Sequence, residues 1–190
     1  MTLSNISGIA TGVSWILGYR VLADALGWPS LQERFSAVGY GVLASSGALA
    51  GVLVLILSAV SAWLKGTIAN PAGVQPGGYL GTTLTQSVLQ SVLNIIVAPA
   101  AEELMFRGLL LDWLMRRLTA VPAIAILSLL FSLIHVRYWS ATPVDWLGLT
   151  YIFAMGVLAS LLTIKYKSLQ PAFVLHVCNN LIAAFVGDVG

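Results

Sequence analysis

The sequence predicts an all-α fold, a polytopic transmembrane helix bundle of about six membrane helices around an internal polar cavity. Of the 190 residues, 58% are apolar and 8% are charged, whereas about a quarter are charged in an average soluble domain. The mean hydropathy is +0.93, and the apolar residues form several stretches of about 20 residues, the length of a membrane helix. This composition excludes a water-soluble enzyme and a disordered chain. The net charge of +2 is too small for a nucleic-acid-binding face.

The first 80 residues contain predicted membrane helices but no chemical motif. Apolar stretches run from about residue 6 to 26 and from about residue 38 to 64, and the second has 27 residues without a charge. It includes Gly47 and Gly51, four residues apart among other small residues. This spacing lets helix backbones approach closely, so we interpret it as helix packing, either within the chain or between chains. Residues 66–80 are rich in proline and glycine and are expected to form a loop.

The second half of the chain holds the polar residues of interest. Residues 1–190 are expected to form a single transmembrane domain, with its functional core at about 82–187, because no repeat or linker divides the chain. Further apolar stretches cover about residues 82–98, 102–118, 120–136, 144–164 and 169–186. Pro99 falls between the first two, so residues 82–118 are expected to form either one kinked helix or two pieces.

The first polar cluster is the segment Glu102-Glu103-Leu-Met-Phe-Arg107. Glu103 and Arg107 are one helical turn apart with the acid first, the order that favours an ion pair. Glu102 points about 100° away on a helix and has no partner in the sequence. A charge at the bilayer centre costs at least about 2.5–3.5 kcal/mol, so such residues usually have a function. Glu102 is then suited to proton transfer. The alternative is that the cluster only anchors a helix end at the membrane surface.

Two further clusters place a histidine one helical turn from a second side chain. Phe131 precedes His135 by four residues, and His176 precedes Asn180 by four, while Asn179 is expected to point elsewhere. The chain has only these two histidines, and both lie in apolar stretches. His135 could be an interfacial residue, and the other pair could join helices by hydrogen bonds. One interior cavity would satisfy all the polar groups together, namely Glu102, Glu103, His135, His176 and Asn180.

In chain order the three clusters have the form EExxxR, FxxxH and HxxxN, each on a separate predicted helix. This arrangement resembles the CPBP family of CAAX proteases and bacteriocin-processing enzymes, also called the Abi family, whose best-known members are the Rce1-type intramembrane proteases. The resemblance covers about residues 97–184, and its most specific part is the segment from Glu102 to Gly108. It implies a multi-pass integral membrane protein, and at this length a compact member from the cytoplasmic membrane of a prokaryote.

The resemblance also implies a mechanism of intramembrane proteolysis. Glu102 and His135 would activate a water that attacks a peptide bond near the C-terminus of a peptide or prenylated-protein substrate. His176 and Asn180 would stabilise the oxyanion. Glu103, Arg107 and Phe131 would support these catalytic residues. No cofactor is expected, and membrane lipid is the other expected partner.

Three alternatives stay open on the sequence. The same Glu and His side chains could bind zinc in a metalloprotease, although the chain lacks the HExxH pattern that places two ligands on one helical turn. A relative of this family could also act without catalysis, as a membrane protein for bacteriocin immunity. A small transporter could use buried Glu and His groups as a proton relay. The substrate and the oligomeric state are likewise open.

Overall fold

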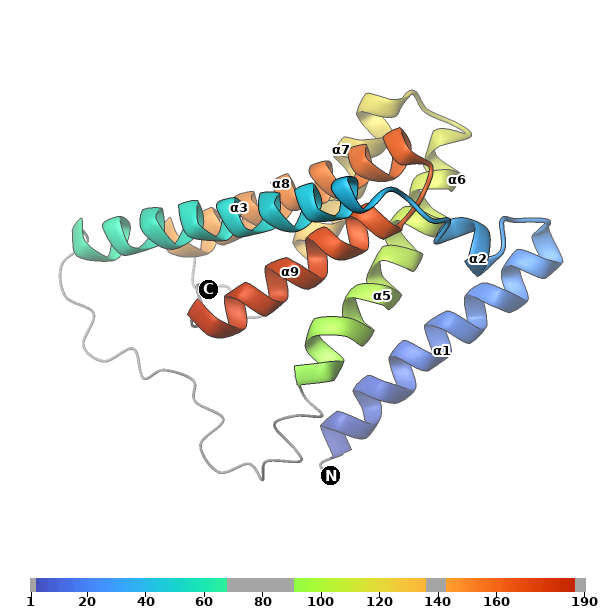
Figure 1. Ribbon diagram of the computed structural model, residues 1–190, viewed down its shortest axis with the longest axis horizontal. Coiled ribbons are helices and arrows are strands. Elements are labelled where there is room, and N and C mark those ends of the chain that lie inside the picture. Colours follow the sequence, from blue (N-terminus) through green and yellow to red (C-terminus); the bar gives the residue numbers. More distant parts are fainter. Residues whose placement is uncertain (1–2, 68–90, 136–142, 187–190) are drawn as a thin grey trace.

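The computed structural model describes residues 3–67, 91–135 and 143–186, and every regular element in these ranges is helical (Figure 1). The elements are α1 (Leu3–Leu26), α2 (Leu31–Arg34), α3 (Tyr40–Thr67), η1 (Leu93–Val97), α5 (Ala98–Glu103), η2 (Leu104–Leu110), α6 (Leu111–Met115), α7 (Ala120–Leu133), α8 (Pro143–Tyr166) and α9 (Gln170–Val186). The segments η1 and η2 are π-helical. The all-α prediction is confirmed for this part of the chain.

Residues 91–115 form one uninterrupted helix at the centre of the molecule, which we call the central helix. It runs through η1, α5, η2 and α6 without a loop. The prediction allowed one kinked helix or two pieces, and the described residues form one. Pro99 comes directly after η1 and near the start of α5. The helix therefore accommodates the missing N–H of proline by a change of hydrogen-bonding register instead of a break.

The other helices pack on the central helix and on one another. The long helix α3 runs along α9 and α8, α7 packs on α8, and α1 contacts the central helix from the opposite side to α9 (Figure 1). At Gly47 an added Cβ would lie 3.2 Å from Sγ of Cys178, and at Gly51 it would lie 3.5 Å from Cδ1 of Ile182. The packing interpretation of these two glycines is confirmed, and their partner is α9 of the same chain.

Among the described residues, two helices are long and apolar enough to cross a membrane by length and composition. These segments are Tyr40–Ser61 in α3 and Trp146–Tyr166 in α8, and only 17% and 22% of their most apolar windows are buried in the protein. The core helix of a soluble protein would be mostly buried, so these exposed apolar faces fit a lipid environment. Ala120–Leu133 is a shorter apolar helix. The count of about six membrane helices goes beyond these two and stays a prediction.

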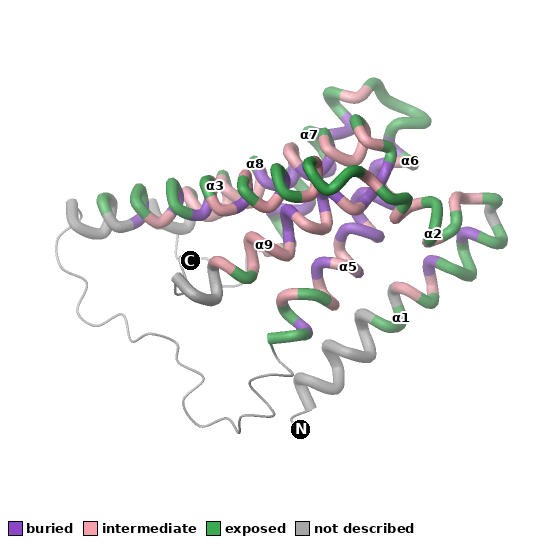
Figure 2. The backbone as a smooth tube through the Cα atoms, in the orientation of Figure 1, coloured by how far each residue is buried: buried purple, intermediate pink, exposed green. Residues whose placement is uncertain are grey.

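Buried residues are concentrated on the central helix and on the inner face of α7, whereas the outer face of α7 and most of α3 are exposed or half-buried (Figure 2). One apolar cluster joins Phe106 and Leu111 of the central helix to Leu127 and Phe131 of α7. A second cluster joins α3, α8 and α9. The fully buried side chains also include the charged Glu103 and Arg107 of the central helix. Arg107 contacts α8 through a hydrogen bond to the carbonyl oxygen of Gly156.

Candidate active site

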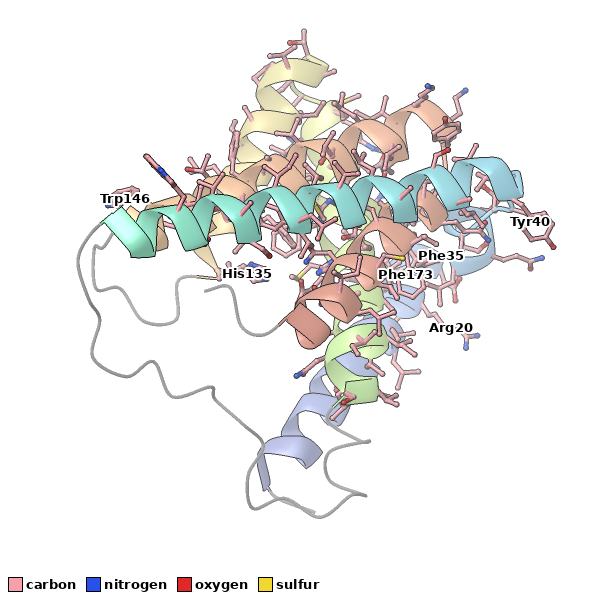
Figure 3. All side chains as sticks on the ribbon, turned by 60° about the vertical axis from the view of Figure 1, so that its left-hand side comes forward. Arg20, Phe35, Tyr40, His135, Trp146 and Phe173 are labelled. Atoms are coloured by element: carbon pink, nitrogen blue, oxygen red, sulfur yellow. The ribbon has the colours of Figure 1, made fainter. Side chains whose placement is uncertain are left out.

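Three helices bring the two glutamates and both histidines into one cluster. Glu102 and Glu103 end α5, His135 follows the last turn of α7, and His176 lies in the middle of α9. Oε2 of Glu102 is 3.7 Å from Nε2 of His135 and 3.8 Å from Nε2 of His176. Figure 3 labels His135, which lies beneath α3 in that view. These polar side chains are therefore neighbours, although they are separated by up to 74 positions in the sequence.

Glu103 and Arg107 form the predicted ion pair, and it is buried. Nη1 of Arg107 lies 3.0 Å from Oε1 of Glu103, and each side chain is 1% exposed. Nη2 of Arg107 donates to the carbonyl oxygen of Gly156 on α8, at 3.3 Å. The guanidinium carbon lies 4.4 Å from the ring centroid of Phe131, a cation–π distance. The pair is thus held between the central helix, α7 and α8, which fixes the orientation of Glu103.

The partners of the two histidines decide which ring nitrogen carries the proton. Nδ1 of His135 is 2.7 Å from the carbonyl oxygen of Phe131, and Nδ1 of His176 is 2.9 Å from Oε1 of Glu103. A carbonyl oxygen or an ionised carboxylate only accepts hydrogen bonds, so both Nδ1 atoms donate. Each Nε2 then faces Glu102, with a lone pair when the ring is neutral and with a proton when it is charged.

The distances around Glu102 fit a single bridging molecule. Oε2 of Glu102 is buried and has no hydrogen-bond partner in the protein. The distances of 3.7 and 3.8 Å to the two Nε2 atoms are too long for direct hydrogen bonds but fit one water bound to all three groups. A carboxylate and imidazole nitrogens around one water are the groups that general-base catalysis uses.

Phe131 packs against both histidines and against Arg107. Its ring centroid lies 4.7 Å from that of His135 and 5.8 Å from that of His176, the second pair edge to face. It also packs edge to face on Phe106 at 5.1 Å and is 4% exposed. The ring therefore contacts both imidazoles and the Arg107 guanidinium, so it holds all three charged or polar groups at fixed spacing.

Asn180 lines the same cavity as Glu103 and the two histidines and makes polar contacts of its own. Its Nδ2 donates to the carbonyl oxygen of Asn94 in η1, and its Oδ1 accepts from Nδ2 of Asn179, each at 3.0 Å. The hydroxyl of Tyr151 on α8 donates to Oδ1 of Asn179. Sequence reasoning missed Tyr151 and placed Asn179 on another face of its helix, which was wrong. Residues three and four positions after His176 are both its neighbours on the helix surface, one on either side of it, so both can line the same cavity.

A cavity of about 240 Å³ opens beside these side chains. Its polar lining comes from Glu103, Arg107, His135, Tyr151, His176, Asn179 and Asn180. Its apolar lining comes from Val54 and Leu57 of α3, Ile152, Met155 and Ala159 of α8, and Leu175 of α9. A cavity lined by both polar and apolar side chains can bind a peptide carbonyl and an apolar side chain of the same substrate.

Comparison with known proteins gives the family. Residues 84–182, just over half of the chain, match the model of the Rce1-like family, described as type II CAAX prenyl endopeptidase Rce1-like. The chain belongs to this family. The resemblance drawn from EExxxR, FxxxH and HxxxN is thereby confirmed, and the matched residues include all three clusters. No curated protein and no solved structure matches the chain in the same comparisons.

Members of the Rce1-like family are integral membrane proteins that act on prenylated proteins or peptides. Membership therefore indicates peptide hydrolysis as the chemistry and the membrane as its location. Metal binding is the alternative chemistry for the donors around Glu102. Among the described residues, no group of three or more His, Cys, Asp or Glu side chains is arranged to hold a metal ion. One donor atom of His176 is already bonded to Glu103, which leaves Nε2 for any ligand.

Proposed function

We propose that this protein is a CAAX-type intramembrane endopeptidase in which Glu102 activates a water for attack on a peptide bond near the C-terminus of its substrate, which can be prenylated. One observation supports this most directly. Oε2 of Glu102 is buried without a protein partner and faces Nε2 of both histidines at distances that one water would bridge. We further propose about six membrane helices in the cytoplasmic membrane of a prokaryote, with residues 82–187 as the catalytic core.

In the proposed reaction Glu102 is the general base. A water between Glu102 and His135 donates one hydrogen to the carboxylate and the other to the Nε2 lone pair of the imidazole. As Glu102 takes its proton, the water oxygen bonds to the carbonyl carbon of the scissile peptide, and the carbonyl oxygen becomes an oxyanion. The protonated Glu102 then gives its proton to the amide nitrogen. The C–N bond breaks to leave a carboxylic acid and an amine.

We assign His176 and Asn180 to the oxyanion. Nδ2 of Asn180 has two hydrogens, of which one is bonded to the carbonyl of Asn94, so the second can be donated to the substrate. Nε2 of His176 can donate only in the imidazolium form, because Nδ1 already holds a proton for Glu103. Two fixed donors in a site without bulk water are worth roughly 3–4 kcal/mol each in such reactions.

The test is peptide cleavage by wild-type and Glu102→Gln proteins purified in detergent. The substrates are a quenched, farnesylated CaaX peptide and the same peptide without the prenyl group, each with and without a metal chelator. We expect Glu102→Gln to lower kcat by at least about 100-fold, the usual contribution of general-base catalysis. The control is Glu33→Gln, since Glu33 is an exposed glutamate in the capping box of α2, where glutamine can replace it. We expect wild-type rates for that variant.

Other outcomes separate the alternatives. Activity that survives Glu102→Gln would contradict the role of Glu102. Loss of wild-type activity in the chelator, with recovery on adding zinc, would replace the proposed mechanism with a metal-dependent one. If wild type cleaves an unprenylated peptide and not the farnesylated one, the protease stands and the prenyl substrate fails. No cleavage of either would favour an immunity role without catalysis.

A further inference from the structure

A line of three side chains crosses from α8 to the central helix beside the cluster. The hydroxyl of Tyr151 donates to Oδ1 of Asn179, Nδ2 of Asn179 donates to Oδ1 of Asn180, and Nδ2 of Asn180 donates to the carbonyl oxygen of Asn94. All three side chains line the cavity. The EExxxR, FxxxH and HxxxN motifs include only Asn180 among them.

The direction of these hydrogen bonds is determined at the Asn94 end, and the Tyr151 hydroxyl can adapt to it. The carbonyl oxygen of Asn94 can only accept, so the amide of Asn180 must turn its Nδ2 toward it. Oδ1 of Asn180 then faces the neighbouring amide, which must present its Nδ2, and Oδ1 of Asn179 is left to accept from Tyr151. A tyrosine hydroxyl can donate here, so every member has the partner that it requires.

We propose that Tyr151 and Asn179 are positioning residues that hold the amide of Asn180 with Nδ2 toward the reacting carbonyl. The inference rests on the proposed function, in which Asn180 stabilises the oxyanion. An asparagine side chain has a donor and an acceptor of nearly equal size. If the amide turned by half a rotation, it would present Oδ1 to the oxyanion and would repel the charge that the site must stabilise. The donation from Asn179 disfavours that turn.

A purely structural role is the competing explanation, since the same bonds also connect α8, α9 and the central helix. A structural tie would affect the stability of the fold and the binding of substrate, whereas a positioning role acts in the transition state. The oxyanion forms only after attack, so a misdirected Asn180 lowers kcat and leaves KM unchanged. The split between kcat and KM therefore separates the two roles.

The first experiment measures kcat, KM and thermal unfolding in detergent for Tyr151→Phe and Asn179→Asp, with the farnesylated CaaX peptide. Tyr151→Phe removes only the hydroxyl, and we expect kcat to fall about tenfold, the value of one hydrogen bond, with KM unchanged. Asn179→Asp can still accept from Tyr151 but cannot donate to Asn180, so its kcat should fall at least as far. Because Tyr151 acts through Asn179, the double variant should be no slower than Asn179→Asp.

The matched control is Tyr40→Phe, which removes a hydroxyl from a residue that is 91% exposed at the start of α3 (Figure 3). It should keep the wild-type kcat. The proposal is overturned if Tyr151→Phe and Asn179→Asp turn over at the wild-type rate, if their losses multiply in the double variant, or if they change only the unfolding temperature or KM.

A second measurement keeps this inference separate from the proposed function. If the wild-type protein cleaves no peptide, the proposed function fails, and the orientation of Asn180 is then tested by NMR of protein labelled with ¹⁵N-asparagine. The side-chain NH₂ signal of Asn180 is assigned by its disappearance in Asn180→Asp. We expect that signal to shift in Tyr151→Phe and to stay in place in Tyr40→Phe. An unmoved signal in both variants would overturn the inference regardless of activity.

Discussion

Two acid–base pairs, one within the central helix and one at its C-terminal end, have the same sequence spacing and nearly the same N–O distance, yet they differ in how far they are buried. Arg107 lies 3.0 Å from Glu103, and Arg116 lies 3.2 Å from Asp112, each pair four residues apart. The side chains of the first pair are each 1% exposed, whereas those of Arg116 and Asp112 are 59% and 31% exposed. Sequence spacing and distance are therefore poor guides to what a pair contributes, and the surroundings decide.

The buried pair is surrounded by further partners. Arg107 also donates to the carbonyl of Gly156 and stacks over Phe131, and Glu103 also accepts from His176. Removing two charges from solvent is costly, and the cost is offset only where such extra hydrogen bonds and close geometry are present. Asp112, in contrast, is shared between two arginines and is open to solvent. The first pair thus determines the geometry of the site, and the second can vary.

The largest effect is expected for Arg107→Ala. The substitution leaves Glu103 as a buried charge without its partner, and breaking such a pair destabilises a protein by about 3–5 kcal/mol. Reversible unfolding in mixed detergent measures the loss, with Arg116→Ala as the matched control on the same helix. The comparison fails if the two alanine variants lose equal stability. Because Glu103 also holds His176, we expect Arg107→Ala to lose peptide cleavage as well.

An intermediate effect is expected for Gly156→Ala, because the carbonyl oxygen of Gly156 accepts a hydrogen bond from Arg107 of the buried pair. A Cβ at this position would lie 3.0 Å from Cβ and 3.1 Å from Cα of Ser128, so α7 and α8 must move apart. Forcing an extra methyl into a closely packed contact costs about 1–3 kcal/mol. The movement would also displace the carbonyl that accepts from Arg107. Unfolding in mixed detergent and cleavage rates both measure this effect.

Gly148→Ala is the control for that substitution, because it lies on the same helix and an added Cβ there would meet nothing within 4 Å. Alanine is also the better helix former by about 1 kcal/mol. We therefore expect Gly148→Ala to be as stable as the wild type or slightly more stable. A loss at Gly148 equal to that at Gly156 would mean that the close contact with Ser128 is not the cause.

Helical periodicity was sufficient to predict which residues share one face of a helix and which face packs closely. The ion pair of Glu103 and Arg107 and the close packing at Gly47 both follow from residues spaced four apart. Hydropathy likewise predicted the helical class, because a chain so poor in charge can satisfy its backbone in lipid only by helices or closed barrels. These are local properties, and a single sequence contains them.

Contacts between helices could not be predicted in the same way. Nothing in the sequence indicates that His176 bonds to Glu103 through Nδ1, since the two lie 73 positions apart and the choice of nitrogen depends on helix rotation. Tyr151 was missed because a tyrosine in an apolar stretch is usually an interfacial or packing residue. The two π-helical segments were missed as well, because they depend on the register of the backbone hydrogen bonds and not on composition.

The smallest effect is expected for Arg116→Ala in the exposed pair. Asp112 keeps a second partner in that variant, since its Oδ2 also lies 3.1 Å from Nη2 of Arg34, and solvent replaces what is lost. Exposed pairs of this spacing contribute about 0.3–0.5 kcal/mol, and salt screens them. The stability loss should therefore be close to the limit of detection and should disappear at high salt, whereas that of Arg107→Ala should persist. A loss at Arg116 that exceeds 1 kcal/mol, roughly the upper bound for exposed pairs, or that does not respond to salt, would show that exposure does not distinguish these two pairs.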